Sequence, residues 1–386
     1  MIILDKPYVS GFLKETINEN QIPVLKNTFA NTELKEDYPF FIPGNDAAQH
    51  LTQKNHPHVL CPSENSLEWL HKTVPHSPLA INSLLFKDKV QFRKRTQHLY
   101  PDLFYREISL SELRDAPSSL SYPCVVKPAV GFFSLSVYTL FSEDDAREML
   151  IDIEKKHQSI EHIYPKSVLD TTRFIAEEYI QGTEYAFDAY FDVDGNPVVM
   201  GIFQHYFASD VDVSDRLYIT SADIMQEHLA SFTAFLSSIN KKLNLRNFPL
   251  HTEVRINDNG SVVPIEINPL RFGGWCTTAD LTWHAYGFNP YLSFFKNESP
   301  QWSKILTAHN KYVHGLVVLN NSTGVEGSQI SSFNYQKLLQ DYKSIIELRK
   351  TDFKKYPLFG FLFVKIKNDD IRTLEPLLNS SLLEYI

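Results

Sequence analysis

The stretch "HTEVRINDNGSVVPIEINP", residues 251–269, decides the fold. Two apolar-rich runs flank the dipeptide Asn259-Gly260, which is typical of a two-residue type I′ hairpin turn. A hairpin closed by that turn places Glu253 directly opposite Glu266. The sequence therefore predicts two antiparallel strands with a pair of facing carboxylates.

Side chains alternate across a strand, so this hairpin should have one polar and one apolar face. The polar face carries His251, Glu253, Arg255, Glu266 and Asn268, with His251 opposite Asn268. The apolar face, which we expect to lie in a core, carries Thr252, Val254, Ile256, Val263, Ile265 and Ile267.

Facing carboxylates repel each other, so something positive should lie between or beside them. In one interpretation Arg255 supplies the charge and the face is simply salt-bridged or solvated. In the other, a divalent cation supplies it, because Glu253, Glu266 and Asn268 offer the hard oxygen ligands that Mg²⁺ or Mn²⁺ prefers. Magnesium held by few protein oxygens completes its shell with water and substrate phosphates. The residues alone leave both interpretations open.

Composition narrows the class of protein. The 386 residues suffice for two or three packed domains. The formal net charge of −9 argues against a nucleic-acid partner. Three widely spaced cysteines predict neither a disulfide framework nor a metal set. No apolar run has the length of a membrane span or of a signal-peptide core, so we expect a soluble, cytoplasmic protein without a membrane partner.

The first third of the chain alternates strand and helix patterns. Apolar runs at 1–4, 22–25 and 58–61 favour strands, and helical patterns begin near Gly11 and Ser63. Such alternation predicts a parallel sheet with helix crossovers. No G-x-G-x-x-G motif supports a dinucleotide site.

Further along, the chain is richer in hairpins. Residues 122–140 are expected to form a strand, a glycine-containing turn and a strand, and the turn at 193–197 predicts another hairpin. A helix is expected to begin after Ser142, with that serine as its N-cap. Another is expected over 224–243, where apolar residues recur at helical spacing.

Taken in order, several short segments resemble those of the ATP-grasp superfamily, in particular its carboxylate–amine ligases. The resemblance covers roughly residues 85–290 and depends on the ordered set, since each motif alone is common. The segments are "KDK" (87–89), "CVVKPAVGFFS" (124–134), "EEYIQGTEY" (177–185), and the metal-ligand strands "HTEVR" (251–255) and "IEINP" (265–269).

This resemblance implies a mixed α/β and α+β architecture. Two lobes of an ATP-grasp fold would clasp ATP, preceded by an N-terminal α/β domain with a parallel sheet. We accordingly expect four parts: an N-terminal domain over 1–85, a small lobe with the phosphate lysine and lid over 86–175, a large lobe with the hinge and metal site over 176–300, and a C-terminal α/β subdomain completing the large lobe over 301–386.

The resemblance also assigns phosphate contacts. Lys89 and Lys127 would meet the phosphates as point charges. Ser134 would donate to them from the loop after Lys127. That loop departs from the glycine- and serine-rich lid of related enzymes, because Phe132 and Phe133 stand beside Gly131.

The predicted hinge would hold the nucleoside. Glu177, Glu178, Tyr179 and Ile180 would lie at the adenine edge, with backbone groups of 178–180 making the hydrogen bonds. Glu184 would lie at the ribose.

The facing strands would hold the metal. Glu253, Glu266 and Asn268 would bridge one or two Mg²⁺ ions to the β- and γ-phosphates, where cations neutralise charge as the phosphoryl group moves. Arg271 would stabilise the charge that develops on the γ-phosphate or acyl phosphate.

Substrate contacts are expected from residues around this site. Gly273 and Gly274 would let backbone approach the substrate closely. His205 is either a satisfied strand histidine or an acceptor-site residue, and His251 either positions substrate or supports the metal ligands. Arg216 either pairs within the protein or contacts a phosphate or a substrate carboxylate.

The implied activity is an ATP-dependent ligation. A substrate carboxylate would become an acyl phosphate and then form an amide with an amine, using ATP and Mg²⁺ (or Mn²⁺). The substrates would be small molecules such as an amino acid or a small peptide. Two alternatives stay open, a small-molecule kinase on the same scaffold and a nucleotide-binding module without turnover. A homodimer is compatible with the sequence.

Overall fold

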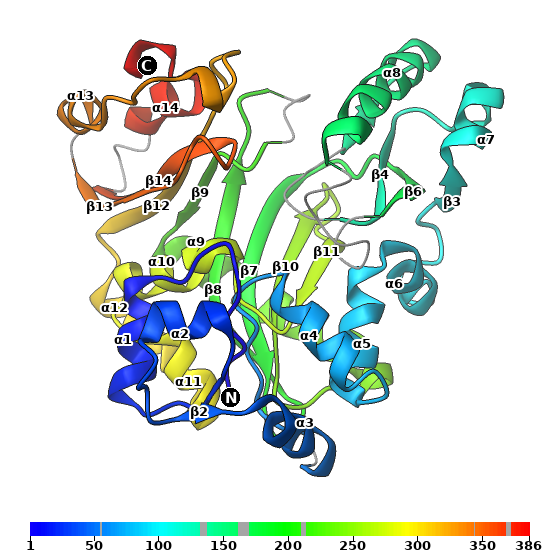
Figure 1. The fold of residues 1–386 in the computed structure, drawn as a ribbon. Helices are drawn as coiled ribbons and strands as arrows, with labels where there is room; N and C mark the ends of the chain where they lie inside the picture. The colour runs from blue at the N-terminus through cyan, green and yellow to red at the C-terminus, as the bar shows by residue number, and fades with distance from the viewer. Residues whose placement is uncertain (55, 132–136, 161–169, 210–213, 343, 368–371) are drawn as a thin grey trace.

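The residues that the structure describes form three β-sheets. The computed structural model describes residues 1–386 except 55, 132–136, 161–169, 210–213, 343 and 368–371. The N-terminal region lies below two larger sheets (Figure 1, blue). The four-stranded sheet lies on one side, under the helices α7 and α8, and the C-terminal strands lie on the other.

The N-terminal region contains the predicted parallel sheet, but its strands are very short. β1 (Val24–Leu25) pairs in parallel with β2 (Phe41–Ile42). Ile2 forms single parallel bridges to Val24 and to Leu60, so the runs expected at 1–4 and 58–61 contribute isolated bridges rather than full strands. All three of these residues are fully buried, which explains the apolar runs in the sequence.

Helices connect and flank these bridges. Ser10 caps the first of them through the Leu13 amide, and Asn27 and Ser77 cap two others in the same way. The helices are α1 (Gly11–Glu19), α2 (Thr28–Leu34), α3 (Gly44–Gln53), α4 (Ser66–Thr73), α5 (Pro78–Lys87) and α6 (Lys89–Thr96). The helix expected near Ser63 begins three residues later, at Ser66.

The four-stranded sheet is antiparallel, with the order β3-β6-β4-β5. Its elements are β3 (Tyr105–Ser109), α7 (Leu110–Asp115), β4 (Cys124–Val130), β5 (Tyr138–Leu140), α8 (Glu143–Ile160) and β6 (Asp170–Glu178), with a 3-10 turn at Pro117–Ser119. Ala146 and Met149 of α8 pack in one buried cluster with Val126 and Ala176 of the sheet. Ser142 caps α8 as predicted, with its Oγ 3.2 Å from the Asp145 amide nitrogen.

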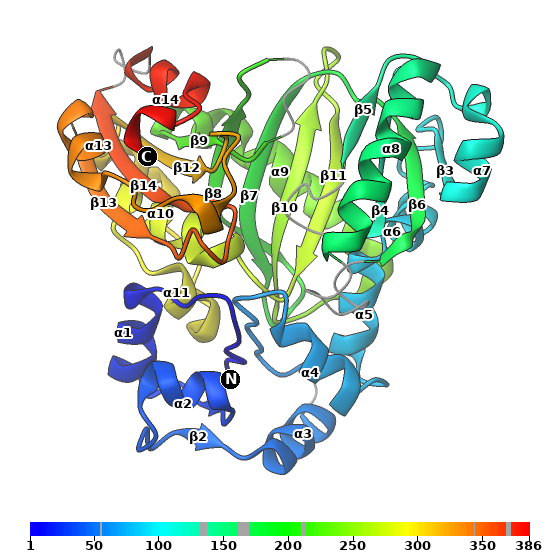
Figure 2. The same ribbon diagram turned by 45° about the horizontal axis from the view of Figure 1, so that its top comes forward.

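The large sheet has eight strands in the order β11-β10-β7-β8-β9-β12-β14-β13 (Figure 2). The strands are β7 (Thr183–Phe191), β8 (Pro197–Tyr206), β9 (Leu217–Thr220), β10 (Phe248–Ile256), β11 (Val262–Pro269), β12 (Tyr312–Asn320), β13 (Ile345–Lys350) and β14 (Leu358–Lys367). The last three come from the C-terminal part of the chain and extend the same sheet. The predicted domain boundaries remain a proposal. The boundary between the small and large lobes, at residue 175, falls within β6.

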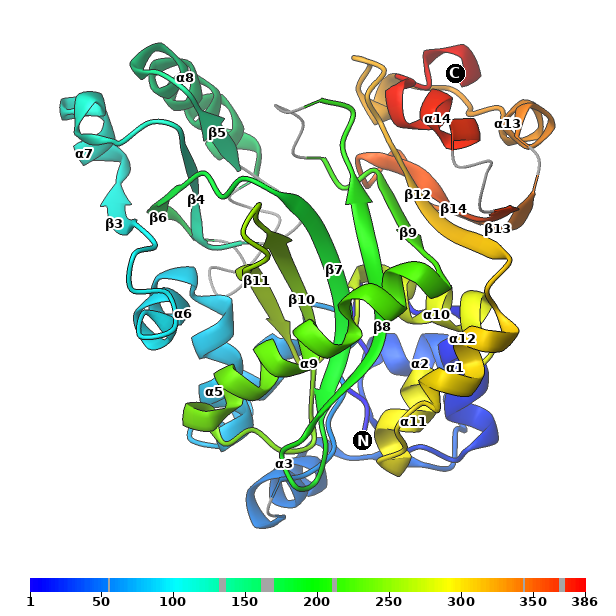
Figure 3. The same ribbon diagram turned by 180° about the vertical axis from the view of Figure 1, so that it is seen from behind.

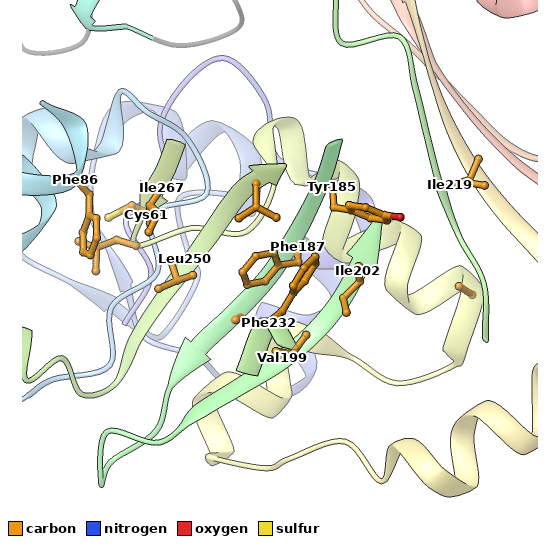
Figure 4. Packing of buried hydrophobic residues seen from close by; sticks show 14 of the residues in the cluster. Cys61, Phe86, Tyr185, Phe187, Val199, Ile202, Ile219, Phe232, Leu250 and Ile267 are labelled. Atoms are coloured by element: carbon orange, nitrogen blue, oxygen red, sulfur yellow. The ribbon is translucent and has the colours of Figure 1, made fainter. Parts of the chain in front are cut away.

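The long helix α9 (Ala222–Leu243) crosses the back of β7 and β8 (Figure 3). Phe187 and Ile202 point from the sheet toward Phe232 of the helix, and the Phe187 and Phe232 rings lie 4.7 Å apart (Figure 4). All three side chains are fully buried, and the burial of Phe232 agrees with the helical spacing of apolar residues over 224–243. None of the described helices, α9 included, has the length and apolarity needed to cross a bilayer.

The remaining helices are shorter and follow β11. They are α10 (Thr277–Tyr286), α11 (Pro290–Lys296), α12 (Trp302–Ala308), α13 (Tyr335–Asp341) and α14 (Glu375–Asn379), with 3-10 turns at Gly274–Cys276, Gly327–Gln329 and Leu383–Tyr385.

The hairpin β10–β11 has the predicted register at its functional end. Glu253 pairs with Glu266, and His251 pairs with Asn268. The turn itself differs from the prediction, because Asn257 pairs with Ser261 around a three-residue loop whose Gly260 has φ +81°. This is a type I turn closed by a glycine bulge instead of a two-residue type I′ turn.

A second irregularity restores the register. Between Glu253 and Val254 the pairing with β11 shifts by one residue, which leaves Ile265 as the extra residue. Strict alternation assigns Ile265 to the core, and that expectation is wrong. Ile265 instead lines the pocket described below, because the bulge interrupts the alternation.

The backbone near Gly182 predicts a sharp sensitivity. Gly182 has φ +131°, and a Cβ added there would lie 2.1 Å from the Ile256 carbonyl oxygen. Gly182→Ala should therefore lower the free energy of unfolding by about 2 kcal/mol or more. Gly44→Ala is the matched control, since nothing lies within 4 Å of its added Cβ, and it should change stability by less than about 1 kcal/mol. Urea denaturation followed by circular dichroism would measure both. Equal effects of the two substitutions would contradict the steric argument.

Candidate functional site

A pocket lies between the four-stranded and eight-stranded sheets, and most of the predicted site residues line it. They are Lys89, Lys127, Glu177, Glu178, Tyr179, Ile180, Glu184, His205, His251, Glu253, Glu266, Asn268, Arg271, Gly273 and Gly274. Segments far apart in sequence therefore meet at one place. Ser134 falls outside the described residues.

The two facing carboxylates have unequal surroundings. Burial and the charge of Glu266 raise the pKa of Glu253 well above its usual range. Burial would also raise the pKa of Glu266, but the Lys89 and Lys87 ammonium groups outweigh it and lower that pKa. Lys89 Nζ lies 3.2 Å from Glu266 Oε2. One lysine thus compensates one member of the pair, and Glu253 lacks comparable compensation.

Arg255 does not supply the missing charge. Its Nε donates to Glu184 Oε2 at 3.0 Å, and its Nη1 donates to the Ile180 carbonyl at 2.7 Å. The arginine is therefore engaged with the hinge and the strand that follows it. The structure therefore does not support the interpretation in which Arg255 offsets the charge of Glu253 and Glu266.

Asn268 fits a cation beside this pair. It is 3% exposed, and its side-chain Oδ1 has no hydrogen-bond partner among the residues that the structure describes. A buried acceptor left unpaired costs about 1–3 kcal/mol, so this oxygen is available to a water molecule or a ligand. No group of three or more His, Cys, Asp or Glu side chains in the described ranges could hold a metal. The predicted donor set of Glu253, Glu266 and Asn268 has two carboxylates and one amide, and these oxygen ligands would suit Mg²⁺ or Mn²⁺.

Lys127 lies in a buried charge cluster with Glu177 and Arg93. Lys127 Nζ is 2.8 Å from Glu177 Oε2, and Arg93 Nε donates to Glu177 Oε1. Burial would raise the pKa of Glu177, but the Arg93 and Lys127 charges hold it at about 2. The carboxylate expected at the adenine edge is thus committed to two cations.

The sequence-based prediction missed Arg93. Both terminal nitrogens of its guanidinium are buried without a hydrogen-bond partner in the described part of the chain, and the side chain lines the pocket. The available signal was its spacing, because a residue four positions after Lys89 on a helix lies on the same face.

The predicted adenine hinge is partly engaged within the protein. The Glu178 amide donates to the Phe104 carbonyl at 3.1 Å, and the Tyr179 amide donates to the Pro123 carbonyl at 3.3 Å. The Tyr179 ring lies 5.1 Å from the Arg255 guanidinium. Two of the backbone amides expected to hydrogen-bond adenine, those of Glu178 and Tyr179, therefore already donate within the protein.

Glu184 and His205 form a second pair in the pocket. His205 Nδ1 lies 2.9 Å from Glu184 Oε1, and the imidazole stacks on the Tyr218 ring at 4.2 Å. Burial would raise the pKa of Glu184, but His205 and Arg255 outweigh it and lower that pKa. His205 is thus satisfied by its neighbours and also lines the pocket, so it combines features of both interpretations.

His251 is oriented by Asp188, which the sequence-based prediction missed. Asp188 is fully buried, and its Oδ1 lies 2.7 Å from His251 Nδ1 and accepts from the Gly273 amide at 3.1 Å. The other ring nitrogen of His251 lies 3.7 Å from Glu253 Oε1. An aspartate inside the apolar run "AFDAYF" was the available signal, because a buried charge requires partners.

Arg271 is held by a chain of charges from the N-terminal region. Its Nε donates to Glu64 Oε1 at 2.8 Å, and Lys87 Nζ lies 2.7 Å from Glu64 Oε2. All three side chains are buried. Nothing local in the sequence could reveal Glu64, which is 207 positions from its arginine partner.

Gly273 is required by close packing. A Cβ there would lie 2.1 Å from Thr278 Oγ1, which accepts from the Gly273 amide at 2.7 Å. Gly273 and Gly274 both line the pocket.

Arg216 lies elsewhere, and this corrects the expectation that it reaches a substrate. It is not among the residues that line the pocket. Its guanidinium donates to the carbonyls of Leu378 and Ser380 and to Ser322 Oγ. The C-terminal segment supplies these acceptors, and its position could not be deduced from the sequence around Arg216.

The Glu64 cluster predicts a pH-dependent stability. Burial would raise the pKa of Glu64 above 4.5, but Lys87 and Arg271 hold it at about 2. Glu64→Gln should lower the free energy of unfolding by about 3 kcal/mol at pH 7, because it leaves two buried cations without their shared anion. The folded state favours the ionised carboxylate, so this contribution is complete above pH 4.5 and is lost as the pH falls toward 2.

Urea denaturation of both proteins at pH 7, 4 and 3 would test this. The stability gap between wild type and variant should narrow at the two lower values. A gap that stays constant over this range would contradict the assignment.

Comparisons with known proteins agree with this geometry. Residues 120–279 match the model of the ATP-grasp domain. A search of curated proteins finds no match. Among solved structures, an L-amino acid ligase from Bacillus licheniformis is 17% identical with a TM-score of 0.67, over 98% of this chain and 96% of that one.

Other enzymes share the fold over similar lengths. An N5-carboxyaminoimidazole synthase from Aspergillus clavatus, solved with ADP and 5-aminoimidazole ribonucleotide, is 12% identical with a TM-score of 0.66, over 98% and 97% of the two chains. A phosphoribosylglycinamide synthetase from Anaerococcus prevotii is 17% identical with a TM-score of 0.55, over 98% and 97%. At these identities the structures show the fold alone, but the fold extends over nearly the whole chain. Residues 120–279 therefore contain an ATP-grasp domain, and the chain shares the ATP-grasp fold over nearly its whole length.

Proposed function

We propose that this protein is an ATP-dependent ligase that couples a carboxylate to an amine. It would activate the carboxylate as an acyl phosphate and form an amide or peptide bond, with release of ADP and phosphate. The substrates would be small molecules. Similarity to an L-amino acid ligase supports an amide product, and the pocket supports the use of ATP.

One observation carries this proposal. Glu253 and Glu266 face each other inside the pocket beside Asn268, whose Oδ1 has no partner among the described residues. Lys89, Lys127 and Arg271 line the same pocket. Oxygen ligands for a cation, surrounded by cations for phosphates, are what a magnesium–triphosphate complex requires.

The residues present fit a magnesium ion. Glu253, Glu266 and Asn268 would hold it, and when bound it would neutralise charge on the β- and γ-phosphates. Lys89 is paired with Glu266, so its ammonium would lie beside the same phosphates. Lys127 is fixed in direction by Glu177, which reduces the entropy lost when it meets a phosphate.

The protein's own groups then support two steps. A substrate carboxylate oxygen attacks the γ-phosphorus, the bond from that phosphorus to the β,γ-bridging oxygen breaks, and ADP leaves. A neutral amine next attacks the acyl carbon, the bond from that carbon to the phosphate oxygen breaks, and the nitrogen passes a proton to the departing phosphate. Arg271, held by Glu64, would offset negative charge in both transition states.

Dependence on both substrates tests the proposal. ADP release should require an acid and an amine together, and mass spectrometry should show their amide as the product. ADP release with an acid or alcohol alone, accompanied by a stable phosphorylated product, would instead establish a kinase. Nucleotide binding without any stimulated ADP release would establish a binding module.

The metal assignment makes a separate prediction. Glu266→Gln removes one negative ligand and almost no volume, so it should lower kcat/KM for MgATP at least about 100-fold and weaken Mn²⁺ binding in the presence of ADP. The far-ultraviolet circular dichroism spectrum should stay that of wild type, which would show that the fold is retained. Glu227→Gln is the control, because its side chain is 74% exposed on α9, outside the pocket. Turnover by the Glu266 variant at the rate of the control would refute the assignment.

A further inference from the structure

One end of the pocket is apolar and comes from the C-terminal strands. Leu316 of β12 pairs with Tyr218 of β9, and Val318 of β12 pairs with Phe361 of β14. Paired residues on adjacent strands project from the same face of a sheet, and all four of these line the pocket. They form a continuous wall, which we call the β9–β12–β14 wall.

Asp215 lies beside this wall and also lines the pocket. Its Oδ1 accepts from the Tyr218 hydroxyl at 2.5 Å, and its carbonyl accepts from Asn320 Nδ2 at 3.3 Å. Tyr218 of β9 therefore holds the carboxylate, and Asn320 of β12 holds the backbone of the same residue. A positioned carboxylate beside an apolar surface can bind a cationic group attached to an apolar body.

The basic side chains of the pocket have other partners. Lys89 pairs with Glu266, Lys127 pairs with Glu177, and Arg271 pairs with Glu64. His205 stacks on Tyr218 of the wall, and its Nδ1 is hydrogen-bonded to Glu184. The pocket is thus polarised, with its lysines toward the predicted phosphate site and Asp215 at the apolar end.

We propose that this end binds the carboxylate substrate and that this substrate is an amino acid with an apolar side chain. The side chain would lie on the β9–β12–β14 wall, and the ammonium group would bind Asp215. The carboxylate would extend toward Arg271 and the metal ligands. This inference rests on the proposed ligase function and adds the chemical class of the acid.

The ammonium at Asp215 belongs to the acid and not to the attacking amine. A nearby carboxylate stabilises the protonated form of an amine, which has no lone pair for attack. The amine that forms the new bond must be neutral. Asp215 therefore suits an amino group that stays protonated through both steps.

A substrate comparison tests the proposal. Alaninamide serves as the amine, because it cannot act as the acid. Leucine and phenylalanine are compared with 4-methylpentanoate and 3-phenylpropanoate, which lack the amino group, and with aspartate, which has a charged side chain. Coupled ADP release and product mass are measured. The two apolar amino acids should show kcat/KM at least about tenfold above each of the other acids.

Asp215→Asn should raise KM for the preferred amino acid at least about tenfold, with KM for ATP changed less than about twofold. It should also remove most of the preference over the acid without the amino group. The matched control is Asp223→Asn, an exposed acid at the start of α9, which should match wild type. Val318→Ala tests the wall independently and should shift the preference toward larger side chains.

The outcomes separate this inference from the proposed function. Equal kcat/KM for leucine and 4-methylpentanoate, or a Val318 variant with unchanged side-chain preference, would overturn the inference and leave the ligase function intact. Absence of amine-dependent ADP release with every acid would overturn the proposed function, and the inference with it.

Discussion

The repulsion between Glu253 and Glu266 is the constraint on which the rest of the site depends. Two partly buried carboxylates on paired strands are unfavourable unless positive charge accompanies them. Lys89 compensates Glu266, while burial and that neighbour keep the pKa of Glu253 high. The unpartnered oxygen of Asn268 adds a third acceptor at the same place. In the proposed function, a magnesium ion would supply the positive charge that this arrangement lacks.

Buried ion pairs join the three parts of the molecule around this place. Glu64 of the N-terminal region holds Arg271 after β11, and Arg93 of α6 holds Glu177 of the small sheet. The C-terminal strands complete the large sheet and supply the apolar wall of the pocket. Each partner removed would leave a charge without its counterion in a buried setting, so the parts are coupled through the site as well as through the core.

The sequence predicted most of the residues that line the pocket, but it did not predict the residues that hold them in position. Alternation and the Asn-Gly turn were enough to place Glu253 opposite Glu266, although the turn has three residues and a bulge compensates for it. The predicted pairing is therefore correct partly by chance, because two irregularities cancel. Ile265, the extra residue of the bulge, lines the pocket although alternation assigned it to the core. Asp188 and Glu64 escaped notice because their partners lie 63 and 207 positions away, a distance over which no local pattern acts.

The most direct measurement is a structure of the protein with magnesium and a nonhydrolysable ATP analogue. Our account predicts oxygen atoms of Glu253, Glu266 and Asn268 within about 2.1 Å of an ion that also contacts the β- and γ-phosphates. Ordered nucleotide with these three side chains directed away from the ion, or with no ion between them and the phosphates, would contradict it.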